Sequence, residues 1–215
     1  DLRATNRRGE TPLLAAAIRR DQEATALLIA QDPQADLVDA EGNTPLLALL
    51  QRQRSDEAKL LLPGANLQAK NARGETALHL ATDPDMIALL VAQGANLETR
   101  DRDGETPLAH QVAAKQPKAA LALLQAGAHP TPRLLHLAVR RELTDVAKEL
   151  LARGTPVDAK DDAGATPLLL AVQTGAQQLV KQLLDHTADP NLADASGNTP
   201  LHAAVSERNA KALTE

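Results

Sequence analysis

The chain has 215 residues, a formal net charge of -5, and no cysteine, phenylalanine, tyrosine or tryptophan. The negative charge argues against general nucleic-acid binding, and the absence of cysteine excludes disulfides, thiolate metal sites and thiol nucleophiles. No apolar run reaches the roughly 18 residues that a membrane-spanning helix needs. A large globular core without aromatic side chains would be unusual, whereas thin helical layers packed on alanine and leucine need none.

A short phrase built around a glycine recurs along the whole chain. Its glycines are Gly9, Gly42, Gly74, Gly104, Gly164 and Gly197, separated by 33, 32, 30, 60 (two periods) and 33 residues. The fullest copy reads Gly197-Asn198-Thr199-Pro200-Leu201-His202-Ala203-Ala204. A fixed period in this range indicates a repeat protein whose units stack on their neighbours.

A glycine followed by Thr-Pro-Leu-His and alanine at this spacing resembles the ankyrin repeat. The resemblance covers the whole chain and implies an all-α ankyrin-repeat solenoid of antiparallel helix pairs joined by hairpin loops. We expect a single domain over residues 1–215, with six full repeats and one partial repeat. The approximate bounds are 1–38, 39–70, 71–100, 101–130, 131–160, 161–193 and, for the partial repeat, 194–215.

Both ends of the sequence fall inside a repeat. Residues 1–9 align without gaps on residues 96–104, so the chain starts within a hairpin, and we expect something to precede it in the full protein. The last repeat stops barely into its second helix, which would leave either a short cap or a cut edge.

Each repeat has the same local signals. The threonine of the phrase suits a helix N-cap, and the proline after it suits the first helical position, where no N–H is missed. A short helix rich in alanine and leucine follows, then a polar turn and a second helix that ends in a Leu-Leu pair. A Gly-Ala closes the second helix at Gly64, Gly94 and Gly127, where glycine can take the left-handed conformation. Such helices are too short to persist without neighbours.

Three stretches depart from this pattern. The loop at 31–34 is irregular, and the turn at 81–85 predicts a connection between helices that is shorter by about one helical turn. The largest departure follows Ala128, where six residues are missing and most of a projecting hairpin is lost with them. Thr131 and Pro132 can then serve as an early cap and first helical residue.

The six histidines are the first candidates for chemistry. The resemblance implies that His79, His136 and His202 are structural hydrogen-bonding posts between loops. His110 occupies a position that is apolar in other repeats, and it can be either a core or rim residue or a functional one. His129 and His186 lie at helix C-terminal ends, where a cation suits the helix dipole. No histidine pair has metal-ligand spacing on one helix, so the sequence predicts no metal site.

Motifs for enzymatic chemistry are missing as well. The sequence contains no Gly-x-Ser-x-Gly, no phosphate-binding loop and no dinucleotide fingerprint. Acid pairs at the hairpin tips, Asp101 with Asp103 and Asp161 with Asp162, are interpreted as solvated turn residues. We therefore predict that the chain is not an enzyme and binds no cofactor.

The surface remains as the candidate for binding. In ankyrin-like stacks the hairpin tips and the solvent face of the first helices carry binding, and a charged surface of no special function is the alternative. Arginine recurs at both places, and its planar fork suits a partner with an acidic or aromatic-bearing surface. The candidate residues are Arg7, Arg8, Arg73, Arg102 and Asp103 at the tips, Arg19, Arg52, Arg140 and Arg141 on the inner face, and His110.

The sequence predicts a non-enzymatic, monomeric module that binds a partner protein through a concave face and the hairpin tips. A stand-alone bacterial inhibitor, immunity or protective protein fits this prediction, and so does an adaptor fragment of a larger protein. The alternative is a regulatory or substrate-docking arm of an enzyme whose catalytic domain lies outside residues 1–215. A cysteine-free chain is compatible with either the periplasm or the cytoplasm.

Overall fold

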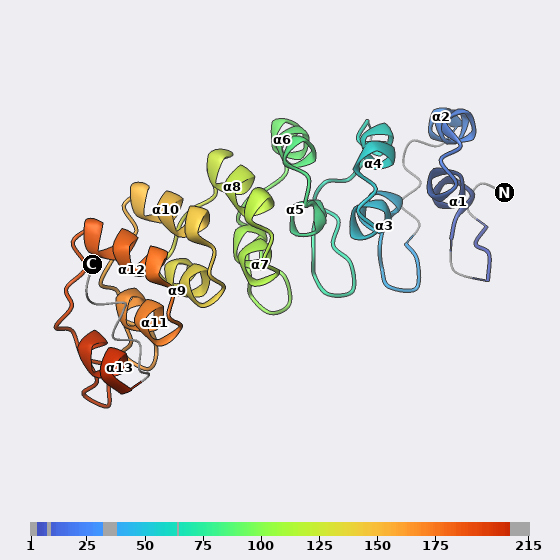
Figure 1. Cartoon of the computed structure of the whole chain (residues 1–215). Coiled ribbons are helices and arrows are strands. Elements are labelled where there is room, and N and C mark those ends of the chain that lie inside the picture. The colour runs from blue at the N-terminus through green and yellow to red at the C-terminus, as the bar shows by residue number, and fades with distance from the viewer. Residues whose placement is uncertain (1–3, 8–9, 32–37, 64, 207–215) are drawn as a thin grey trace. The chain divides into compact units, whose positions relative to one another are not determined.

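The computed structural model describes residues 4–7, 10–31, 38–63 and 65–206, and within these ranges every regular element is an α-helix (Figure 1). The helices that come first in each repeat are α1 (Pro12–Ile18), α3 (Pro45–Gln51), α5 (Ala77–Leu80), α7 (Pro107–Ala113), α9 (Pro132–Arg140), α11 (Pro167–Gln173) and α13 (Pro200–Ser206). The helices that come second are α2 (Gln22–Gln31), α4 (Ser55–Leu61), α6 (Pro84–Ala92), α8 (Pro117–Gln125), α10 (Thr144–Ala152) and α12 (Gln177–Asp185). The predicted all-α fold is confirmed.

Contacts group the chain into two units, one of residues 1–111 with 125–128, the other of residues 112–124 with 129–215. In the first unit α1 packs on α3, α3 packs on α5, and α2 packs on α4. In the second unit α9 packs on α11, α11 packs on α13, and α10 packs on α12. Within each unit, first helices therefore contact first helices and second helices contact second helices. The single-domain arrangement over 1–215 stays a prediction.

The helices begin where the phrase predicts. The hydroxyl oxygens of Thr11, Thr44 and Thr166 accept the backbone N–H three residues further on, at 3.2, 3.4 and 3.2 Å, and proline follows each threonine in the first turn. Threonine thus satisfies one of the N–H groups that a helix start leaves without a partner. Gly94 and Gly127 have positive φ, as predicted for the ends of α6 and α8, whereas Gly64 lies outside the described residues.

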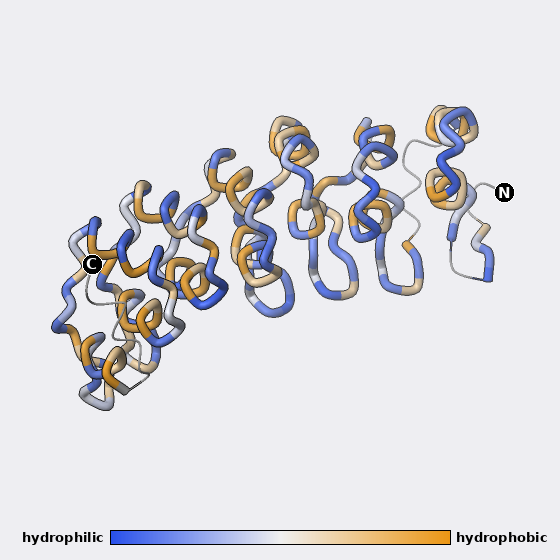
Figure 2. The backbone as a smooth tube through the Cα atoms, viewed as in Figure 1, coloured by the Kyte–Doolittle hydropathy of each residue, from blue (hydrophilic) through white to orange (hydrophobic). Residues whose placement is uncertain are grey.

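The core consists almost entirely of leucine and alanine. Leu47, Leu78 and Leu135 are at most 1% exposed, and Ala48 and Ala58 are fully buried. Figure 2 shows hydrophobic residues concentrated on the helices and hydrophilic residues on the loops between them. Because alanine takes little space, the helices pack closely without aromatic side chains to fill the layers.

The shortening predicted between 81 and 85 falls on a helix and not on the turn. α5 has only 4 residues, against 7 in α3, while the connections that follow α3 and α5 have the same length. Proline at 84 disfavours a helical residue before it. The buried side-chain amide of Gln111 donates to the carbonyl oxygens of His79 (2.7 Å) and Ala81 (3.0 Å). These bonds satisfy backbone carbonyls at the C-terminal end of α5, where the helix stops prematurely.

Successive hairpins are held together by single backbone hydrogen bonds. In each bond, the donor is the backbone N–H of the residue two positions before a hairpin glycine. The acceptor is the carbonyl oxygen of the residue one position before the glycine of the previous hairpin. The pairs are Ala72 to Glu41 (2.9 Å), Arg102 to Arg73 (3.0 Å) and Ala195 to Ala163 (3.1 Å). The contact is close enough that a Cβ on Gly74 would lie 2.9 Å from the backbone nitrogen of Arg102.

His79 is the predicted structural post. Its Nδ1 accepts the backbone N–H of Thr76 (3.1 Å), and its Nε2 donates to the carbonyl oxygen of Glu105 in the next hairpin (3.1 Å). The ring is fully buried, and burial lowers its pKa below the ordinary value of 6.5, partly opposed by the bond to Glu105. The neutral imidazole therefore joins α5 to the following hairpin.

Gly74 and Gly104 have the same φ of +77, so comparing alanine substitutions at the two positions separates the energetic cost of backbone strain from that of hairpin packing. Gly104→Ala is expected to cost about 1 kcal/mol, since the left-handed conformation is strained for alanine and its Cβ meets nothing within 4 Å in its own unit. Gly74→Ala is expected to cost more, because its Cβ also meets the next hairpin. Urea unfolding of both variants measures the difference, and equal losses would contradict the close hairpin packing.

His79 predicts a pH-dependent stability. Below an ordinary pKa of 6.5 the unfolded chain binds a proton that the folded His79 resists. The contribution of His79 to the free energy of unfolding is therefore full above that pH and falls as the pH drops toward the lowered folded pKa. Urea unfolding between about pH 7.5 and pH 5 should show a smaller pH slope in His79→Gln than in the unmodified protein. His202→Gln is the control, because the exposed ring of His202 bonds Thr199 as His79 bonds Thr76. An equal change in the pH slope of His202→Gln would contradict the assignment of the slope to the buried His79.

Candidate partner-binding site

The start of α9 lacks a hairpin of its own. Thr131 is the N-cap and Pro132 the first helical residue, as the sequence predicts, and the hydroxyl of Thr131 makes no capping hydrogen bond. Aligned on the shared histidine, α9 begins two residues earlier than α5. The residues left after the deletion thus extend the helix and do not form a projecting loop.

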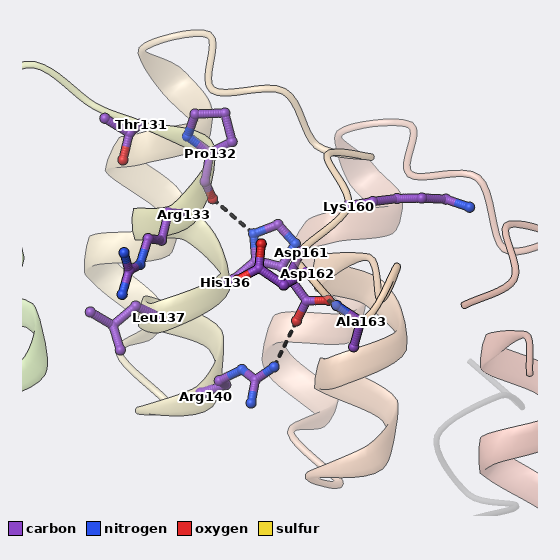
Figure 3. Close-up of a pocket in the computed structure, with 10 residues that line it drawn as sticks. All are labelled: Thr131, Pro132, Arg133, His136, Leu137, Arg140, Lys160, Asp161, Asp162 and Ala163. Carbon is purple, nitrogen blue, oxygen red and sulfur yellow. Dashed lines mark hydrogen bonds and ion pairs between the residues drawn. The ribbon is translucent and has the colours of Figure 1, made fainter. Parts of the chain in front are cut away.

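A cleft of about 630 Å³ lies in the second unit between α9 and the hairpin that follows residue 159 (Figure 3). Its lining residues are Thr131, Pro132, Arg133, His136, Leu137 and Arg140 from α9 and its cap, and Lys160, Asp161, Asp162 and Ala163 from the hairpin. Both walls belong to the same repeat junction, where the following hairpin is present and the preceding one is not. The deletion read in the sequence therefore coincides with a cleft.

Asp161 joins the two walls. Its carboxylate accepts a 2.7 Å bond from the guanidinium of Arg140 and also accepts the backbone N–H groups of Ala163 (3.0 Å) and Ala165 (2.9 Å). Burial alone would raise the pKa of Asp161, but these donors and the nearby His136 outweigh it and lower the pKa. The charged carboxylate closes the hairpin, while the Arg140 side chain stays 53% exposed beside it.

The acid pairs at the hairpin tips divide into two kinds. Asp101 repeats the role of Asp161, accepting the N–H groups of the residues two and four further on, and its side chain is only 5% exposed. The interpretation of both residues as solvated was wrong, since a hairpin this tight turns its closing side chain inward. Asp103 and Asp162 are exposed, as expected.

The ammonium group of Lys160 is hydrogen-bonded within the protein. Its Nζ donates to the carbonyl oxygen of Ala193 (2.7 Å), just as the Nζ of Lys70 donates to Arg100 (2.9 Å) in the first unit. Figure 3 shows its side chain extending away from α9. Arg133, by contrast, is exposed in the first turn of α9 and makes no ion pair or hydrogen bond with any residue that the structure describes.

His136 departs from the pattern of His79. Its Nδ1 faces the carbonyl oxygen of Pro132 (2.9 Å) and its Nε2 faces that of Ala165 (3.1 Å). Both partners are carbonyl oxygens, which can only accept, whereas the Nδ1 of His79 accepts a backbone N–H. The predicted post between loops is present, and its ring lines the cleft.

The inner-face arginines share a structural position. Arg19, Arg52 and Arg141 are the C-caps of α1, α3 and α9, and all three are exposed. A cation near a helix C-terminus is favourable, and Arg52 also donates to the carbonyl oxygen of Ala48 (2.9 Å). Their recurrence therefore has a structural reason beside the predicted binding role.

The predicted tip residues remain on the surface of the first unit. Arg7, Arg102 and Asp103 are exposed, and Arg73 lies 3.5 Å from the carboxylate of Glu75. Arg8 lies outside the described residues.

His110 packs its ring against His79, with centroids 5.8 Å apart, and its Nδ1 lies 3.7 Å from the Asp101 carboxylate. Of the predicted residues, Arg140 lines the cleft. Arg133 was missed, although its place beside the deletion could have marked it. Asp162 was recognised as a hairpin-tip residue but was not among the predicted partner-binding residues.

Other kinds of site find no support in the described residues. Within them, no group of three or more histidine, cysteine, aspartate or glutamate side chains could hold a metal ion. None of the helices in these ranges combines the length and apolar character needed to cross a bilayer.

Known proteins share both the sequence pattern and the fold. The mouse B-cell lymphoma 3 protein homolog is 33% identical over 82% of this chain, and this match covers 44% of that relative. The ankyrin repeat domain of Bcl-3, described as a unique member of the IkappaB protein family, matches with a TM-score of 0.80 at 27% identity, over 96% of this chain and 99% of that domain. The human ASB11 ankyrin repeat domain matches with a TM-score of 0.73 at 25% identity, over 90% and 91%.

The chain spans less than half the length of the curated relatives it matches. The family model for ankyrin repeats, in three copies, matches residues 1–71, 47–133 and 135–215. Ankyrin repeats are protein–protein interaction modules, and the fold is generally non-catalytic. From the repeated phrase, the stacked helix pairs and these matches, the chain belongs to the ankyrin repeat family.

Proposed function

We propose that this chain binds a partner protein through the cleft between α9 and the hairpin at 160–163, without catalysing a reaction. One observation carries the proposal: this junction has a cleft of about 630 Å³ where the preceding hairpin is deleted. A hairpin slot is shaped by the fold to receive polypeptide, since neighbouring hairpins in this chain contact each other through their backbones. A polypeptide is therefore the ligand that the slot suits best.

The partner would carry an acidic or aromatic-bearing surface. The chain has no phenylalanine, tyrosine or tryptophan, so aromatic side chains at an interface must come from the partner. Exposed arginines at Arg19, Arg52, Arg140 and Arg141, with Arg7, Arg73 and Arg102 at the tips, would receive carboxylates or stack on rings. Asp103 and His110 are further proposed contacts in the first unit, the proposed contact Arg8 lies outside the described residues, and the binding form would be a monomer.

Two biological settings fit such a module. The first is a stand-alone inhibitor, immunity or protective protein of a bacterium. The second is a regulatory or substrate-docking arm of a larger enzyme. In the second setting, partner binding would depend on a flanking catalytic domain, so the full reading frame separates the two.

Restoring the deleted hairpin tests the cleft. Inserting a copy of residues 98–103 after Ala128 is expected to fill the slot and abolish capture of the partner from native extract, while the helical circular dichroism is unchanged. Quantitative mass spectrometry of captured proteins compares the inserted and unmodified chains. A partner that is retained equally by both chains would rule out the cleft as the docking surface.

Charge reversal tests the inner-face arginines at the cleft. Arg140→Glu with Arg141→Glu is expected to weaken partner affinity by about tenfold, because two charge-assisted contacts are replaced by repulsion. Loss of the partly exposed bond from Arg140 to Asp161 should lower the unfolding free energy by at most about 1 kcal/mol. The charge-matched control is Lys148→Glu with Lys181→Glu, on exposed positions of α10 and α12 outside the cleft. An equal loss of affinity in both double variants would indicate a general charge effect.

A further inference from the structure

Each hairpin of the stack has a donor side and an acceptor side. The donor is the N–H two residues before the hairpin glycine, and the acceptor is the carbonyl one residue before it, as in Ala195 N–H to Ala163 O (3.1 Å) in the second unit. The same arrangement joins Arg102 to Arg73 (3.0 Å) in the first unit. A hairpin therefore recognises its predecessor through a backbone carbonyl, whatever side chains the predecessor has.

The donor of the hairpin at the cleft is unused. Asp162 lies two residues before Gly164, and its N–H has no hydrogen-bond partner in the part of the chain that the structure describes. Asp162 is exposed and lines the cleft. The cleft thus contains an N–H that, at the equivalent positions Arg102 and Ala195, binds the carbonyl of a preceding turn.

The charged groups around this donor leave one guanidinium without a described partner. Asp161 is already satisfied by Arg140 and two backbone N–H groups, and Lys160 is held on Ala193. Arg133 remains as an exposed guanidinium without a described partner, opposite a single unpaired carboxylate at Asp162.

We propose that the cleft binds an acidic turn of a partner protein, which replaces the missing hairpin by accepting the N–H of Asp162 through a backbone carbonyl and pairing a carboxylate with Arg133. The carbonyl supplies the register, since it repeats the bond that neighbouring hairpins make. The carboxylate supplies selectivity, because Arg133 offers a bidentate fork. This inference rests on the proposed function and specifies the class of partner segment that the same cleft takes.

A peptide of known sequence tests the inference without the natural partner. The probe is a cyclised synthetic peptide with the sequence of residues 97–105, an acidic hairpin of this chain, in which Arg100 and Arg102 are replaced by glutamine, and its neutral counterpart also has every aspartate and glutamate replaced by the amide. Titration into the ¹⁵N-labelled protein is expected to shift the amide resonance of Asp162 and to slow its hydrogen exchange by at least about tenfold at saturation. The neutral peptide should bind about tenfold more weakly.

Two variants locate the charge contact. Arg133→Glu is expected to weaken binding of the acidic peptide by about tenfold, whereas Lys148→Glu, a charge-matched change on exposed α10, should leave it unchanged. Equal binding of the two peptides, an unshifted Asp162 amide, or the same effect from both variants would each overturn the proposal. Inorganic phosphate that reproduces the Asp162 shift would also overturn it, since an anion alone would then explain the site.

The outcome is separable from that of the proposed function. If hairpin insertion abolishes partner capture but the peptide fails to bind, the cleft still docks a protein and the acidic-turn class is wrong. If the peptide binds as expected but capture survives the insertion, the cleft recognises acidic turns and the natural partner docks elsewhere.

Discussion

Nearest-neighbour packing is the constraint on which the rest of this protein depends. Its described helices have between 4 and 10 residues, too few to persist in water by themselves, and they bury their apolar faces against the other helix of their own repeat and against the adjacent repeat. Leucine and alanine suffice for such layers, which explains how a chain without any aromatic residue buries leucines almost completely. The hairpins follow the same rule, since each bonds to its neighbour through one backbone contact.

Within this scheme the buried polar residues act as connectors between repeats. His79 ties α5 to the hairpin at Glu105, and Gln111 supplies the hydrogen bonds that the truncated α5 leaves unmade. His136 keeps the connecting role in the second unit, since its Nε2 again faces the carbonyl oxygen of the residue after the hairpin glycine, Ala165. Its Nδ1 faces the carbonyl oxygen of Pro132, because α9 starts earlier than α5 relative to the histidine. A change in the length of one loop thus alters a hydrogen-bond partner of a residue several positions away.

The sequence predicted the repeat architecture, the threonine caps and the loss of one hairpin, because these features are encoded by local signals at fixed spacing. It did not reveal that Asp101 and Asp161 turn inward, since two adjacent acids look alike until the hairpin closes around one of them. Nor did it identify Gln111, whose partners lie about 30 residues away along the chain. The binding groups of the cleft also depend on contacts that the sequence does not show. Arg140 was a candidate from its position alone. Arg133 and the N–H of Asp162 became candidates only when the structure showed which polar groups already have hydrogen-bond partners.

The single backbone bond between hairpins bears on how such a protein can change over generations. Losing a hairpin from inside the stack sacrifices two such bonds, one on each side, each with a net contribution of about 0.5–1.5 kcal/mol, while the leucine and alanine layers beneath it are untouched. A short in-frame deletion can therefore open a recess on an intact scaffold at a stability cost that the fold tolerates. In a stack of this design, a new recess can arise by deletion of a loop as well as by substitution of side chains, and the spacing of the glycines shows which loop was shortened.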